Sequence, residues 1–263
     1  MLSFAAICPH PPILIPSIGG EEVSKVKNTA EAMKALGRDI KAQGIDTIMI
    51  ISPHGSVFMD AMSINSAKTI SGDLSDFQSD IKMKFENDLE LVSDIISVAD
   101  ANDFPLETVN ESLDHGSLVP LYFLTEEVPE AKLCHMSFSY LDYDEHFTFG
   151  ELLFEAVRRT DKKIAIIASG DLSHRLTTDA PAGFSPDGKV FDRMLIKELE
   201  NGDVKSILNT DQELIDNAGE CGFRSIVILL GALSNTDYRF KKQSYEGPFG
   251  VGYLVGKFEI TDN

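Results

Sequence analysis

The chain has 263 residues, of which 43% are hydrophobic and 25% are charged, as expected of a globular protein with a sizeable core. This length suits one large α/β domain. The net charge of -19 argues against binding to nucleic acid or to anionic membranes, because both partners require a basic surface. The charge does not argue against a neutral or metal-chelating substrate.

The amino-terminal segment and the cysteines predict a cytoplasmic protein. The segment MLSFAAICPHPP has no positively charged leader, and its apolar run is too short to cross a bilayer. The three cysteines, Cys8, Cys134 and Cys221, are widely spaced and form no CxxC pair. A disulfide framework or a structural zinc knuckle is therefore not expected.

Apolar runs alternate with amphipathic segments along most of the chain, which predicts an α/β fold. The runs are nearly continuous, as in parallel strands covered on both faces. The predicted strands are 2–8, 46–52, 132–138 and 163–169. Helical periodicity predicts helices at 23–40, 88–102, 117–127, 145–159, 187–200 and 222–234. The last of these is apolar nearly all round and is expected to be buried.

The last part of the chain alternates with period two at 237–247 and 250–260, around a glycine-rich turn. This pattern predicts an antiparallel strand pair that closes the sheet. Residues 60–87 form a polar insertion with weak strand character. Because no repeat or linker divides the chain, residues 1–263 are expected to form one domain with a central, mostly parallel sheet flanked by helices.

Three of the six histidines lie just beyond the carboxyl ends of predicted parallel strands: His10, His54 and His174. In open α/β sheets this edge is where ligands bind. A single histidine in a loop is more often structural, but three at equivalent positions indicate a site. His115, which precedes a predicted helix, is a fourth candidate. His135 is predicted to be a core or edge residue and His146 to be solvated, and neither is given a role.

Neutral imidazoles would suit a divalent transition metal, which needs a third ligand. Glu220 is the candidate, since it lies at the start of the predicted buried helix, where the helix dipole favours a carboxylate. The alternative is structural, because Asn217 and Glu220 have capping-box spacing and Arg224 could form an ion pair with Glu220. Cys221 is a rival ligand, although a buried thiol is more common.

Five segments resemble one known family: CPHPP, SPHG, LDHGSLVPL, SGDLSHRL and NAGECGFRS. Together they resemble the catalytic chains of the class III extradiol ring-cleavage dioxygenases. Within that family the chain is most similar to the dioxygenase-like domain of AmmeMemoRadiSam system proteins, from residue 5 to about residue 257. Such domains often precede a second domain, so the natural protein could continue beyond residue 263.

The resemblance implies iron(II) bound by His10, His54 and Glu220, with zinc or another divalent metal as the alternative. It implies that His174 acts as the acid and base, and that His115 either orients the substrate or supports a metal ligand. The related Memo proteins have a cysteine in a C-G-x-R segment, which Cys221 and the three residues after it match. Cys221 is therefore the alternative third ligand.

The leading functional prediction is an extradiol dioxygenase-like enzyme that cleaves a catechol-type aromatic with dioxygen. One alternative is a Memo-like metal-binding protein that acts through a protein or redox partner. Another is a metalloenzyme with the same site and a non-catechol substrate. The system association suggests a radical-enzyme partner, and a homo-oligomer is the general expectation for such enzymes.

Overall fold

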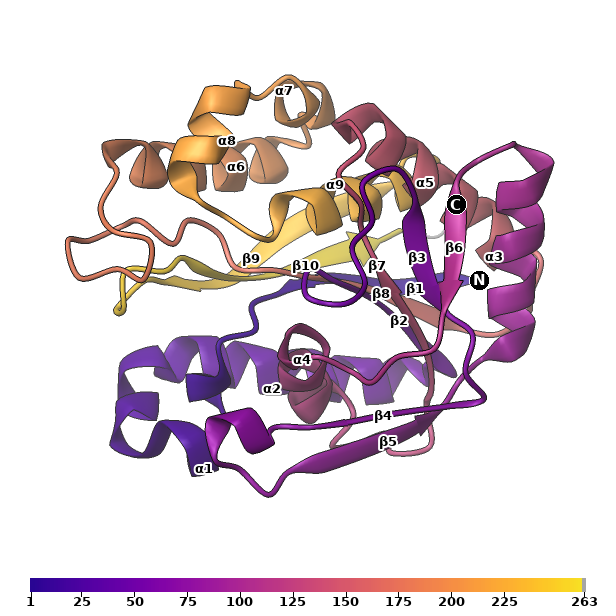
Figure 1. Ribbon diagram of the computed structural model, residues 1–263, viewed down its shortest axis with the longest axis horizontal. Coiled ribbons are helices and arrows are strands. Elements are labelled where there is room, and N and C mark those ends of the chain that lie inside the picture. Colours follow the sequence, from indigo (N-terminus) through magenta and orange to yellow (C-terminus); the bar gives the residue numbers. More distant parts are fainter. Residues whose placement is uncertain (262–263) are drawn as a thin grey trace.

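An eight-stranded sheet runs through the middle of the protein, with helices on both sides (Figure 1). The computed structural model describes residues 1–261. The strand order in the sheet is β6-β3-β7-β2-β8-β1-β10-β9. In chain order these strands are β1 (Leu2–Cys8), β2 (Thr47–Ser52), β3 (Met62–Asn65), β6 (Leu106–Val109), β7 (Lys132–Ser137), β8 (Ile164–Ser169), β9 (Tyr238–Glu246) and β10 (Tyr253–Ile260). The four strands predicted from apolar runs are confirmed to within about one residue.

The central strands β7, β2, β8 and β1 are mutually parallel, and each is almost completely buried. Burial on both faces explains their continuous apolar sequences. The carboxyl-terminal pair, β9 and β10, is antiparallel and adds to β1 through β10. The prediction of a mostly parallel sheet closed by an antiparallel pair is confirmed.

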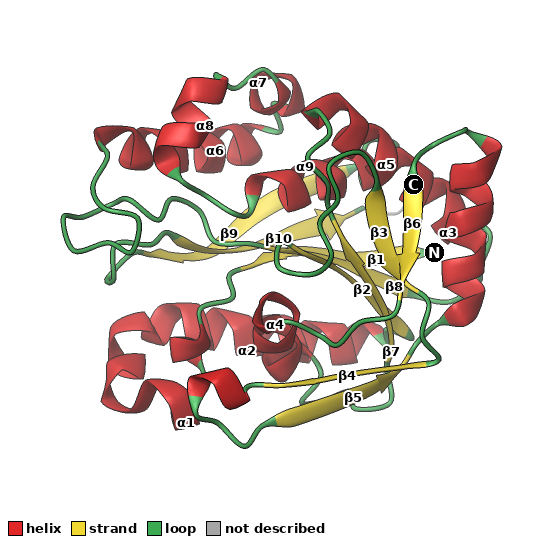
Figure 2. Cartoon of the chain, viewed as in Figure 1, coloured by secondary structure: helices red, strands yellow, loops and turns green. Residues whose placement is uncertain are grey.

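Two layers of helices bury the two faces of the sheet (Figure 2). Along β1, Phe4 and Ala6 belong to one hydrophobic cluster, whereas Ala5 and Ile7 belong to the other. This alternation follows from the two-residue repeat of a strand. The first cluster includes α2 (Lys27–Gln43) and α4 (His115–Leu124), and the second includes α3 (Leu89–Ala101), α5 (Tyr143–Val157), α6 (Pro186–Asn201) and α9 (Phe223–Ala232).

The remaining short helices border these layers. They are α1 (Pro16–Gly19), α7 (Val204–Leu208), α8 (Gln212–Ala218) and the 3-10 turns Pro12–Leu14, Gly20–Val26 and Ser75–Phe77. Within residues 1–261, no helix combines the length and the apolar character needed to cross a membrane.

The polar insertion at 60–87 is more ordered than its sequence suggests. β3 joins the main sheet beside β7, and β4 (Thr69–Asp73) pairs with β5 (Lys82–Glu86) in a separate two-stranded sheet. The polar residues of β3 are buried because they are hydrogen-bonded: Ser63 Oγ donates to Ser56 O at 2.6 Å, and Asn65 Nδ2 donates to Glu111 O at 2.9 Å. A pattern that relies on apolar alternation cannot detect such a strand.

The two histidines without a predicted role are both buried. His135 lies inside β7, as expected, with Nε2 3.5 Å from Asp114 Oδ2. The prediction that His146 is solvated is wrong. Its ring lies under the preceding loop, with Nδ1 2.7 Å from Asp142 O and Nε2 3.1 Å from Ser139 O. Burial lowers the pKa of His146 to about 4.

Candidate metal centre

The loops that follow β1, β2 and β8 meet at the carboxyl edge of the sheet, because these strands are neighbours and parallel. They bring together the rings of His10 and His54, whose centroids are 4.9 Å apart. His115, at the first position of α4, stacks on His54 with a centroid distance of 4.4 Å. The expected convergence of these histidines is therefore present in the structure.

The ring of His10 is held with Nε2 directed toward His54. Ser169 Oγ donates its hydrogen to Gly116 O at 2.5 Å, so it must accept from His10 Nδ1, which lies 3.0 Å away. With Nδ1 protonated, Nε2 of the neutral ring carries a lone pair. This lone pair faces His54 Nε2 across 3.1 Å. A proton or a metal ion must lie between the two atoms.

This arrangement fits a metal ion. Two imidazole nitrogens at about 2.1 Å from one ion and at right angles would lie about 3 Å apart, close to the observed separation. Burial is the main cause that lowers the pKa values of His10, His54 and His115. For His10 and His54, repulsion from the neighbouring histidines lowers the pKa further. The rings are therefore neutral near pH 7, which is the state that binds metal.

Cys221 is the third member of the cluster. One donor atom from each of His10, His54 and Cys221 lies within 4.8 Å of the other two, and Cys221 Sγ is 3.7 Å from His10 Nε2. Two glycines make this approach possible. A Cβ on Gly170 would lie 2.0 Å from Gly222 Cα, so only glycine lets the start of α9 reach the end of β8.

Glu220, the predicted third ligand, lies beside this cluster but is not part of it. Its Oε2 accepts a hydrogen bond from Phe223 N at 2.5 Å and so caps α9. Burial raises the pKa of Glu220 to about 7. Asn217, by contrast, is inside α8 and donates to Asp187 Oδ2 at 2.9 Å, so the capping box considered as the alternative does not form. Metal ligation by Glu220 stays a prediction.

Asp171 is a site residue that the sequence pattern does not single out. Its Oδ1 accepts from His10 N at 3.0 Å. Its Oδ2 lies 4.0 Å from Nε2 of His10 and 4.0 Å from Nε2 of His174. Burial raises its pKa to about 7. The only available signal is its place in SGDLSH, three residues before a candidate histidine.

His174 lies on the other side of Asp171, with a defined tautomer. Because Gly219 O can only accept, the 2.8 Å contact requires that His174 Nδ1 donates. Nε2 of the neutral ring is then free to accept a proton. Burial lowers the pKa of His174, so the neutral form prevails near pH 7. These properties are those of a general base.

Hydrogen bonds of Asp114 and Ser52 hold the backbone segments that carry His115 and His54. Asp114 caps α4 by accepting from Ser117 N at 3.1 Å, and it also accepts from Ser52 Oγ at 2.7 Å. Ser52 Oγ in turn accepts from His54 N at 3.3 Å. Burial opposes ionisation of Asp114, but the contacts with His135 and Ser52 keep its pKa below the usual range. The carboxylate therefore stays charged behind the cluster.

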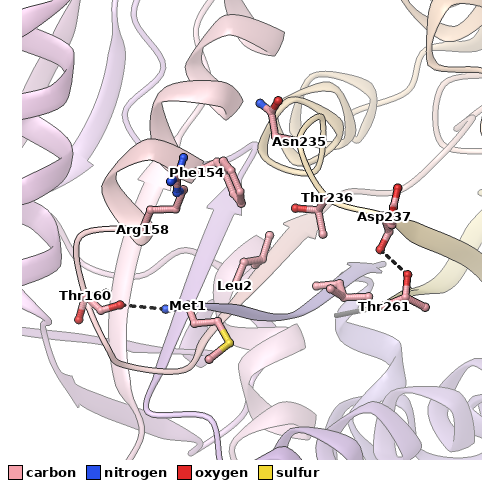
Figure 3. Close-up of a pocket in the computed structure, with 10 residues that line it drawn as sticks. Met1, Leu2, Phe154, Arg158, Thr160, Asn235, Thr236, Asp237 and Thr261 are labelled. Atoms are coloured by element: carbon pink, nitrogen blue, oxygen red, sulfur yellow. Dashed lines mark hydrogen bonds between the residues drawn. The ribbon is translucent and has the colours of Figure 1, made fainter. Parts of the chain in front are cut away.

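A pocket of about 500 Å³ opens beside this cluster, a volume suited to a small organic ligand. Glu220 and Cys221 line it, together with aromatic and polar side chains of α5, of the segment before α5, of α8 and of α9. A second pocket, of about 350 Å³, lies where β1 begins, and Met1 and Thr160 are among its lining residues (Figure 3). This second pocket lies at the opposite end of β1 from His10. The first pocket is therefore the candidate substrate site.

Comparison with known proteins gives the family. Residues 4–256 match the family described as the catalytic LigB subunit of aromatic ring-opening dioxygenase. The match covers nearly the whole chain, and the protein therefore belongs to this family. Its single α/β domain agrees with the resemblance found in the sequence.

Two curated relatives and one solved structure are similar to the chain. Protein CA_C1420 of Clostridium acetobutylicum is 38% identical over 268 residues, which covers 98% of this chain but 57% of that relative. The chain thus spans little more than half of that protein. A 3,4-dihydroxyphenylacetate 2,3-dioxygenase of Escherichia coli is 26% identical over 258 residues, covering 90% of this chain and 92% of that enzyme. The uncharacterized protein JW3007 of Escherichia coli K12 shares the fold, with a TM-score of 0.68 and 15% identity over 97% of this chain and 99% of that one.

Proposed function

We propose that the protein is a metal-dependent dioxygenase that opens an aromatic ring bearing two adjacent hydroxyl groups. The observation that carries this proposal is the pair of facing Nε2 atoms of His10 and His54, with the free Nε2 of His174 nearby. Membership in the LigB family and the similarity to an aromatic-diol dioxygenase support it. Dioxygen and a small aromatic diol are the proposed substrates.

Iron(II) is the proposed metal, because imidazole ligands suit iron and because the resemblance to the extradiol dioxygenases implies it. His10 and His54 would hold it, and the third donor would be Cys221 or Glu220. When bound, the metal supplies the Lewis-acid and redox chemistry that the reaction of a diol with dioxygen needs. Zinc is the alternative ion for the same nitrogen and sulfur donors.

The protein's own residues would then transfer protons to and from the substrate and orient its aromatic ring. His174 Nε2 can remove a proton from one diol hydroxyl, and the resulting imidazolium can return it later in the reaction. Asp171 lies 4.0 Å from this nitrogen, and in its ionised form it can stabilise the positive charge while His174 holds the proton. His115 is proposed to help orient the ring, and the walls of the pocket would limit access of water.

The test is anaerobic purification with elemental analysis, followed by a panel of catechols with oxygen uptake and ring-cleavage absorbance as readouts. We expect about one iron per chain and stoichiometric oxygen consumption with at least one catechol. Iron-loaded protein that consumes no oxygen with any member of the panel would contradict the proposed activity.

A second candidate function is supported by Cys221. A thiol in place of a carboxylate favours softer metals such as zinc or copper(I). In that case the protein would bind metal and act through a protein or redox partner. Stable metal binding without catechol turnover, together with retention of a specific partner in pull-down experiments, would support this second function over the first.

A further inference from the structure

One wall of the substrate pocket is formed by an arginine in an aromatic setting. Arg224 lies three residues after Cys221 at the start of α9, and both residues line the pocket. Its guanidinium carbon is 4.8 Å from the ring centre of Tyr143 and 5.9 Å from that of Tyr140. Nη1 donates to Leu141 O at 2.6 Å. The two rings and this hydrogen bond fix the guanidinium plane at the pocket.

Arg224 is the only basic residue that lines this pocket, and it forms no close ion pair within residues 1–261, although its charge acts to lower the pKa of Glu220. The expected ion pair with Glu220 does not form, since the Glu220 carboxylate caps α9 instead. The other acidic residue of the wall, Asp216, accepts a hydrogen bond from Gln212 at 2.7 Å. A half-buried guanidinium with unused N–H groups is thus directed at a cavity, in a chain with a net charge of -19.

We propose that Arg224 is a specificity-determining residue, which binds a carboxylate on the substrate ring. The planar, five-donor guanidinium pairs with a carboxylate through two parallel hydrogen bonds, and aromatic neighbours favour a flat ligand. The pocket is lined both by Cys221, which belongs to the cluster with His10 and His54, and by Arg224, three residues further along the chain. A ring with its diol at the metal centre would direct an acidic arm at the guanidinium. This inference rests on the proposed function only in assuming that the diol of the substrate lies at the metal centre.

The experiment compares two ligands that differ in the carboxylate: 3,4-dihydroxyphenylacetate and 4-methylcatechol. Binding is measured by calorimetry under anaerobic conditions with metal-loaded protein. We expect wild-type protein to bind the acid at least ~10-fold more tightly. Arg224→Met should weaken binding of the acid by ~10- to 100-fold, as for loss of a charged hydrogen-bond partner, and leave binding of 4-methylcatechol nearly unchanged.

Two further variants serve as controls. Arg158→Met removes an arginine that lines the other pocket and should leave the affinities for both ligands unchanged. Arg224→Lys keeps the charge and should retain part of the preference for the acid, which covers the case in which Arg224→Met folds poorly. Equal affinity of wild-type protein for the two ligands, including no binding of either, would overturn the proposal. An equal loss of both ligands in folded Arg224→Lys would overturn it as well.

The outcome is separate from that of the proposed function. Arg224 is not among the candidate metal donors, so its variants should keep the metal. A preference for the acid without ring cleavage would support the carboxylate site and contradict the dioxygenase activity. Ring cleavage without a preference for the acid would support the dioxygenase activity and contradict the carboxylate site.

Discussion

The Nε2 atoms of His10 and His54 face each other across 3.1 Å, although the strands that precede them are separated in the sheet by β8. The two side chains therefore meet beyond the end of β8. Both rings are neutral near pH 7 because burial lowers their pKa values. Such a pair is unfavourable unless a proton or a metal ion bridges it.

The first prediction concerns this pair. His10→Ala or His54→Ala should abolish stoichiometric metal binding, because each change removes one of the two facing nitrogens. Elemental analysis after anaerobic purification measures the result. His146→Gln, which changes a buried histidine outside the cluster, is the control and should keep the metal. Full metal content in both alanine variants would show that the ion binds elsewhere.

The second prediction separates Cys221 from Glu220. Cys221→Ser should reduce metal affinity, because its sulfur belongs to the cluster of possible donors. Glu220→Gln should retain the metal, because an amide oxygen can still accept the hydrogen bond from Phe223 N. Metal titration with a chromogenic competitor compares the two variants. The opposite order of affinities would restore Glu220 as the third ligand, as the family resemblance implies.

The third prediction concerns the hydrogen bond that orients His10. Ser169→Ala removes the acceptor of His10 Nδ1, so the ring loses its fixed tautomer. We expect metal affinity to fall by ~10- to 100-fold, as for loss of other groups that orient metal ligands. Ser173→Ala is a matched control, because its hydroxyl donates to Ala218 O and not to a histidine. Equal affinities in both variants would assign Ser169 a purely structural role.

The central fold could be predicted because its signal is local. The strands from Leu2 and from Thr47 are apolar at nearly every position, and burial on both faces requires this. β3 could not be predicted, since Ser63 and Asn65 are buried only because partners distant in the sequence satisfy them. The prediction for His146 fails for the same reason, because its partners lie in a loop whose path the local pattern does not determine.

The site could be predicted only in part. The positions of His10 and His54 after parallel strands imply that they share one edge of the sheet, and they do. The choice between Glu220 and Cys221 depends on how closely α9 approaches β8. That approach is set by contact between Gly170 and Gly222, which are far apart in the sequence. Asp171 could not be predicted because its role arises from distances to two rings.

The fourth prediction is a pH dependence of stability caused by His146. Its pKa is about 4 in the folded protein and near 6.5 when unfolded, so the unfolded chain binds more protons between these values. The free energy of unfolding should therefore fall as the pH drops from 6.5 to 4, by up to ~3 kcal/mol from this residue. Denaturant unfolding of wild-type protein and His146→Gln measures the difference, which should be constant above pH 7. An identical slope in both proteins would contradict the assignment.

The last prediction concerns His174, whose Nδ1 donates to Gly219 O and leaves Nε2 free. His174→Gln should keep the metal and lower turnover by ~10²- to 10⁴-fold, the usual contribution of a positioned proton-transfer group. Burial lowers the pKa of His174, so the wild-type rate should fall only as the pH drops below about 6.5, and the variant should lose this limb. A structural histidine would instead lower the melting temperature and leave the pH profile of the remaining activity unchanged. Wild-type turnover by folded, metal-loaded His174→Gln would remove this residue from the reaction.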